Sequence, residues 1–121
     1  MSAEEVAKAF VQHYYQTFDA NVDGLAGLFT DRSMMTWESN QVAGGPQIIA
    51  KVKSFGKMTH AVQTFDVQPS VDPNAILIFV TGSVSIDGNN PLHFCEMFQL
   101  VSAGNNQYAV HNCIFRLNYG M

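Results

Sequence analysis

The chain has 121 residues, of which 47% are apolar and 13% are charged. This length suits one domain over residues 1–121, and the apolar content predicts a packed core and excludes a disordered chain. The net charge of −4 and the absence of a Lys/Arg cluster argue against nucleic acid or an anionic membrane as the main partner.

No apolar segment approaches the roughly 20 residues of a membrane span, so no membrane insertion is expected. The N-terminus lacks the apolar core of a secretory signal, and we expect a soluble, intracellular protein. Cys95 and Cys113 should therefore be reduced thiols. No Cys or His lies near them at ligand spacing, and no phosphate-binding loop is present, so the sequence predicts neither a metal nor a cofactor.

The first half of the chain predicts three helices. Ser2 and Glu5 form a capping-box pattern, and an apolar stripe at helical spacing then runs for about four turns. Asn21 follows this helix and can cap a second, short one. Pro46 is suited to the first turn of a third helix, which ends before Gly56.

The rest of the chain predicts strands. A short strand at 34–38 pairs with 40–43 as a small hairpin. From Thr59 onward the apolar residues alternate with polar ones, which predicts long strands joined by turns; these cover residues 59–69, 76–86, 92–101 and 108–119. Three helices followed by an antiparallel meander indicate an α+β domain.

Two of the long strands carry apolar residues on both faces, whereas the helices can cover only one face of the sheet. The uncovered apolar residues are Leu77, Phe79, Val110 and Ile114. A contiguous exposed apolar patch marks an interface, so we expect a homodimer through this outer face. The alternative is a few tolerated exposed apolar side chains.

Three segments now resemble one family. Residues 10–19 (FVQHYYQTFD), residues 36–38 (TWE) and residues 115–119 (FRLNY) resemble the first helix, a cavity strand and the C-terminal strand of the nuclear transport factor 2 family. The likeness covers nearly the whole chain in order. It implies a cone-shaped fold in which three N-terminal helices pack on a curved antiparallel sheet, with dimers formed through the sheets.

The resemblance also implies a function. Members of the family bind the GDP-bound form of the small GTPase Ran and the phenylalanine-glycine repeats of nucleoporins, the nuclear pore proteins. They carry the GTPase into the nucleus and are not enzymes. We therefore expect a homodimeric nuclear import carrier in the cytoplasm and nucleus, concentrated at the nuclear envelope.

In the family, an aromatic side chain of the GTPase enters an apolar cavity with an acidic rim. Trp37 matches the cavity tryptophan, and Glu38 and Asp87 match rim acids. A further rim position, acidic in the family, is Asn90 here, which weakens one ionic contact. Further residues expected to line the cavity are Phe55, Val84, Ile86 and Phe115. The alternative is that Trp37 and its neighbours fill a closed core.

Two other positions depart from the family pattern. An aspartate often follows the asparagine of the last strand, whereas here Cys113 follows Asn112. An N-terminal tryptophan that helps some members to bind pore repeats aligns with Ala3. Phe79 and Ile114, by contrast, match apolar positions of the family's dimer interface.

Two further hypotheses stay open. The same cone hosts ketosteroid isomerase-like and scytalone dehydratase-like enzymes, so the chain could be a small-molecule enzyme or binder. Such a site needs a base in the cavity, and the candidates are Asp66, His60, His111 and Tyr14, each with an ordinary structural role as its alternative. The other hypothesis is an interaction module whose GTPase affinity has been lost or redirected.

Overall fold

The computed structural model describes residues 2–105 and 107–118, which form an α+β fold. Its elements are the helices α1 (Ala3–Ala20) and α2 (Gly45–Lys53), the 3-10 helix η1 (Val22–Leu28), and the strands β1 (Phe29–Trp37), β2 (Asn40–Ala43), β3 (Met58–Pro69), β4 (Ala75–Ile86), β5 (Leu92–Gly104) and β6 (Gln107–Asn118). The predicted helices and strands are confirmed. Tyr119, the predicted end of the last strand, lies outside the described residues.

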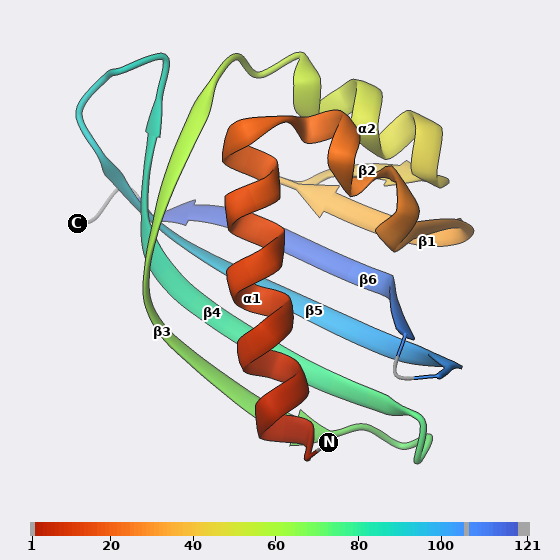
Figure 1. Ribbon diagram of the computed structural model, residues 1–121. Coiled ribbons are helices and arrows are strands. Elements are labelled where there is room, and N and C mark those ends of the chain that lie inside the picture. The colour runs from red at the N-terminus through yellow and green to blue at the C-terminus, as the bar shows by residue number, and fades with distance from the viewer. Residues whose placement is uncertain (1, 106, 119–121) are drawn as a thin grey trace.

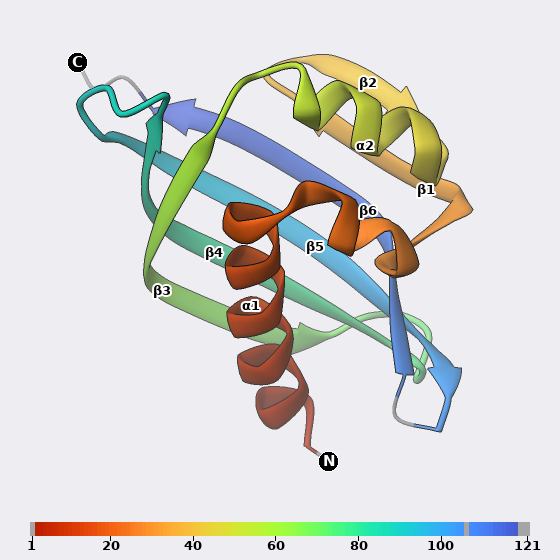
Figure 2. The same cartoon turned by 45° about the horizontal axis from the view of Figure 1, so that its top comes forward.

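The six strands form one curved sheet in the order β2-β1-β6-β5-β4-β3. The sheet bends around α1, and all three helices lie on its concave side (Figures 1 and 2). Every neighbouring pair is antiparallel except β1 and β6, which run parallel. That parallel pairing departs from the expected antiparallel sheet. Within the described chain, no helix has the length and apolar character needed to cross a membrane.

Local hydrogen bonds explain where α1 begins and ends. The Ser2 hydroxyl accepts the N–H of Glu5 at 3.2 Å, and the Glu5 carboxylate accepts the N–H of Ser2 at 3.1 Å, which confirms the capping box. At the other end, the Asn21 N–H donates to the Thr17 carbonyl, and the Asn21 side chain accepts the N–H of Asp23. Asn21 therefore ends α1 and caps η1, as predicted.

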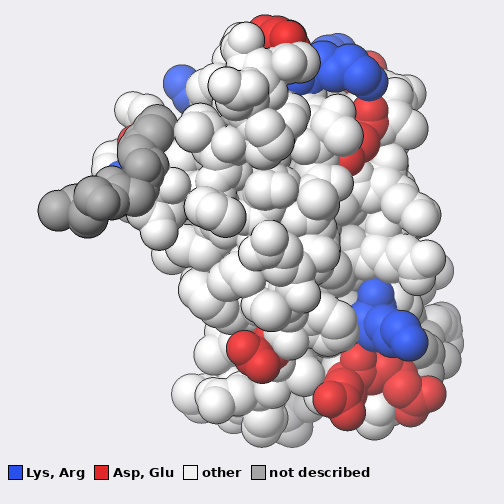
Figure 3. Space-filling view, turned by 90° about the vertical axis from the view of Figure 1, so that its left-hand side faces the viewer, with Lys and Arg blue, Asp and Glu red and all other residues white. Residues whose placement is uncertain are grey.

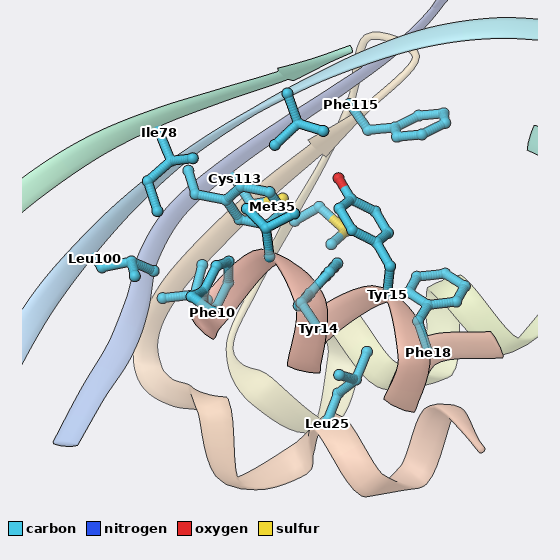
Figure 4. Close-up of a cluster of buried hydrophobic side chains, with 14 of the residues drawn as sticks. Phe10, Tyr14, Tyr15, Phe18, Leu25, Met35, Ile78, Leu100, Cys113 and Phe115 are labelled. Carbon is cyan, nitrogen blue, oxygen red and sulfur yellow. The ribbon is translucent and has the colours of Figure 1, made fainter. Parts of the chain in front are cut away.

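The core lies between α1 and the concave face of the sheet. Figure 4 shows aromatic residues of α1, among them Phe10, Tyr14 and Phe18, packed beneath the strands. Tyr14 is fully buried, which confirms the structural role considered for it. The inner faces of β4 and β5 supply the opposing side chains, including Ile78 and Leu100.

A β-bulge in β6 overturns one prediction. Gln99 pairs with Asn112 while Leu100 pairs with Val110, so His111 is an extra residue in the ladder. An extra residue reverses the alternation of side chains along the strand. Val110 therefore points into the core with Cys113 and is 0% exposed. Its placement in the outer patch was wrong, because strict alternation does not anticipate a bulge.

The edge strand β3 also carries irregularities. Its register with β4 shifts between Val62 and Thr64, and it ends at Pro69, which has no N–H to donate. Bulges and prolines are common on exposed sheet edges because they interrupt further strand pairing.

A substitution at Gly82 would test the close packing of β3, β4 and β5. A Cβ atom there would lie 2.3 Å from the Ala61 carbonyl oxygen and 3.1 Å from a ring carbon of Phe94. We expect Gly82→Ala to lower the free energy of unfolding by about 2 kcal/mol through overpacking. Gly27→Ala is the control, because nothing lies within 4 Å of its added Cβ, and it should change the value by less than about 0.5 kcal/mol. Urea denaturation that gave both variants the same midpoint would contradict this account.

Candidate functional site

Four stacked rings, which we call the aromatic stack, lie beneath one end of the sheet. Trp37 stacks on Phe55 with ring centroids 4.6 Å apart and on Phe115 with centroids 3.9 Å apart. Phe115 in turn stacks on Phe94 at 5.5 Å. Trp37 is only 4% exposed, whereas Phe55 is half-buried. The stack therefore runs from a partly accessible ring into the core.

The other two predicted lining residues differ in accessibility. Val84 is buried in the core, and Ile86, two residues further along β4, is half-buried. Trp37 and Val84 thus have the burial of core residues, as the closed-core alternative requires. Surface access to this region is at Phe55 and Ile86, so an incoming side chain would meet these two first.

The two predicted rim acids are held by the main chain. Glu38 has a positive φ of 49°, its N–H donates to the Phe115 carbonyl at 3.1 Å, and its carboxylate accepts the N–H of Leu117. Asp87 has a φ of 54°, its N–H donates to the Lys57 carbonyl at 2.7 Å, and its carboxylate accepts the N–H of Lys57 at 2.9 Å. Folding therefore fixes the orientation of both carboxylates before any partner arrives.

The surroundings of these acids carry both signs of charge. The Lys51 ammonium lies 5.5 Å from the centre of the Phe55 ring, and the Arg116 guanidinium donates to the Ser39 hydroxyl at 3.1 Å. Asn90 is exposed, three residues after Asp87. The adjoining face of the molecule, which includes the edge strand β3, carries few charged side chains across its middle (Figure 3). The rim is therefore mixed in charge rather than purely acidic.

One buried acid, Glu96, was not predicted from the sequence. Glu96 on β5 is 2% exposed, and its carboxylate accepts the Tyr15 hydroxyl at 2.8 Å and the Cys113 thiol at 2.8 Å. Burial raises the pKa of Glu96, and burial together with the nearby carboxylate raises the pKa of Tyr15 and of Cys113. One signal was available, since Glu96 occupies an inward position between Phe94 and Phe98 in an alternating strand.

The candidate catalytic residues do not come together. Asp66 and His111 are exposed, and the buried Tyr14 hydroxyl has no hydrogen-bond partner among the described residues. The His60 side chain is 1% exposed, and its Nδ1 lies 2.7 Å from the Asp19 carboxylate, which also accepts the His60 N–H.

His60 borders a pocket between α1 and β3. This pocket has a volume of about 350 Å³, and Tyr15 and Asp19 also line it, but Glu96 does not. The buried carboxyl is therefore not presented to a molecule in that pocket. The described residues contain no group of three or more side chains that could hold a metal ion.

Comparison with known proteins places the chain in a family. The family model of the nuclear transport factor 2 (NTF2) domain matches residues 6–117. The nuclear transport factor 2 of Oryza sativa subsp. japonica is 47% identical over 99% of this chain and 100% of its own length. That of Saccharomyces cerevisiae is 39% identical over 94% of this chain and 93% of its own.

A solved structure agrees with these relatives. Nuclear transport factor 2 from Cryptosporidium parvum is 41% identical to this chain. The match covers 96% of this chain and 94% of that chain, and the two structures superpose with a TM-score of 0.88. The shared cone and the similarity in sequence thus extend over the same residues. The chain belongs to the nuclear transport factor 2 family.

Proposed function

We propose that the protein is a homodimeric nuclear transport carrier that binds the GDP-bound GTPase Ran at the aromatic stack. It would also bind phenylalanine-glycine repeats of nucleoporins and mediate import of the GTPase, without catalysis. Relatives named nuclear transport factor 2, at 38% to 47% identity over nearly the whole chain, support the transport role. The structural observation that carries the proposal is the Trp37 stack flanked by two pre-oriented carboxylates, Glu38 and Asp87.

The proposed binding step extends the stack by one ring. An aromatic side chain of the GTPase would pack at the half-buried Phe55 and Ile86, removing roughly 150–250 Å² of its own surface from water. Glu38 and Asp87 would pair with basic residues around that ring, which sets orientation and association rate more than affinity. Lys51 beside Phe55 adds a preference for an acidic group on the partner.

The proposed dimer uses the outer face of the sheet. Phe79 is 45% exposed and Ile114 is 46% exposed, and both are register partners of Met97 on the central strand β5. Phe79, Ile114 and the half-buried Leu77 form a continuous apolar patch. Met97 belongs to this patch in place of Val110, which was expected there. Each Å² of this patch removed from water contributes roughly 25 cal/mol to association.

Ala3 restricts what the start of α1 can contribute to repeat binding. Ala3, which aligns with the family's N-terminal tryptophan, is half-buried and has only a methyl group to offer. We expect the carrier in the cytoplasm and nucleus and concentrated at the nuclear envelope, as its proposed cargo and pore partners require.

Charge removal at the rim tests GTPase binding. Glu38→Gln and Asp87→Asn remove the charge but keep a side-chain oxygen for the main-chain N–H that each residue holds. Each should weaken binding of the GDP-bound GTPase about tenfold and reduce the salt dependence of association. Glu4→Gln is the control, because Glu4 is an exposed acid in the first turn of α1, outside both the stack and the outer apolar patch. Unchanged affinity for both rim variants in calorimetry, or equal binding of the GDP and GTP forms, would contradict the proposal.

Introduction of a charge in the apolar patch tests the dimer. Phe79→Glu places a carboxylate in the proposed interface and should convert the dimer to monomers, as measured by analytical ultracentrifugation. Val71→Glu is the matched control, because Val71 is fully exposed and lies in the turn between β3 and β4. A Phe79→Glu variant that sediments as a dimer would exclude this face as the interface.

A further inference from the structure

The buried acid lies directly behind the aromatic stack. Glu96 and Phe115 are register partners on adjacent strands, so the acid is the cross-strand neighbour of a ring in the stack. Tyr15, which donates to Glu96, has its ring centroid 5.8 Å from that of Phe94 and 4.9 Å from that of His60. Tyr15, Glu96 and Cys113, here called the buried carboxyl cluster, thus support the stack from behind.

We propose that Glu96 is a positioning residue for the aromatic stack. The strand register explains how Glu96 and Cys113 come together. Phe98, two residues after Glu96, pairs with Cys113, so Glu96 and Cys113 are diagonal neighbours on one face of the sheet. The small Cys113 leaves room for the longer Glu96 and donates its thiol to it.

The cluster fixes two side chains at once. Both carboxylate oxygens of Glu96 are used, one by Tyr15 and one by Cys113. Without this acceptor, the buried Tyr15 hydroxyl would lack a partner, and Tyr15 would no longer be held against Phe94. A change at Glu96 should therefore reach Trp37 through Phe94 and Phe115, although Glu96 need not touch the GTPase. In this respect the inference rests on the proposed function.

Several ionisable groups surround Glu96 and influence its pKa. Tyr14 and Tyr15 approach from α1, Cys113 from β6, and His60 from β3, with Asp19 bound to His60. Because burial raises the folded-state pKa above the ordinary value of 4.5, Glu96 is protonated in both states well below pH 4.5. As pH rises above 4.5, the Glu96 carboxyl ionises in the unfolded chain before it ionises in the folded one. The free energy of unfolding therefore falls until the pH passes the folded-state pKa of Glu96. Glu96→Gln should abolish this decline.

A pair of tyrosine variants tests the hydrogen bond. Tyr15→Phe should raise the unfolding equilibrium constant about tenfold or more, because it removes one of the two donors to a buried carboxyl. Tyr14→Phe is the matched control on the same helix, since its hydroxyl lies close to Cys113 but does not donate to Glu96, and it should change the constant less than about threefold. Equal effects of the two variants in urea denaturation would overturn the role assigned to the cluster.

A double-mutant cycle tests the coupling between Glu96 and Cys113. Cys113→Asp alone places two carboxyl groups in one buried site and should be strongly destabilising. Glu96→Gln combined with Cys113→Asp leaves one carboxylate, on β6, and the new side-chain amide on β5 can donate to it. The double variant should therefore be more stable than Cys113→Asp alone, by about tenfold or more in the unfolding constant. A double variant no more stable than that single variant would overturn the coupling between Glu96 and Cys113.

The only tryptophan of the sequence, Trp37, reports on positioning. We expect Glu96→Leu, which removes both acceptor oxygens, to alter the near-ultraviolet circular dichroism of Trp37 and to weaken GTPase binding about tenfold. Glu96→Gln, which keeps an oxygen for Tyr15, should change both less. A Trp37 signal unchanged in a folded Glu96→Leu variant would overturn the inference. A Trp37 signal altered by Glu96→Leu, together with no GTPase binding by the unsubstituted protein, would instead refute the proposed function and leave the positioning role standing.

Discussion

The contact between Trp37 and Phe115 is the constraint on which the rest of the site depends. These residues are register partners in the parallel ladder of β1 and β6, and their rings stack at a centroid distance of 3.9 Å. Glu38, the next residue, bonds twice to the main chain of β6. One junction therefore fixes the ring stack, the strand pairing and the direction of a rim carboxylate.

Much of the fold was predictable because its signals are local. The capping box at Ser2, the cap at Asn21 and the alternation in β3 to β5 each depend on residues a few positions apart. The parallel pairing of β1 with β6 and the bulge at His111 depend on contacts between distant segments. Periodicity carries no information about either, which is why Val110 was assigned to the wrong face.

The geometry of the candidate site was predictable only in part, for a related reason. Resemblance identified Trp37, Glu38 and Asp87, but not that both acids are tied to main-chain N–H groups, since that depends on their positive φ angles. Glu96 was not predicted because the resemblance points only to acids at the rim, whereas the alternation along β5 places this residue on the inward face. A charged residue at an inward strand position is a signal that resemblance alone does not supply.

The irregular edge strand has a consequence for assembly. A smooth outer edge would let sheets join side by side without limit, in the manner of a growing filament. The register shift after Val62 and the terminal Pro69 leave β3 a poor template for such growth. The association proposed for the face around Phe79 would use the same surface on both copies, so it would be complete when two molecules meet. The geometry of one edge thus favours a particle of finite size.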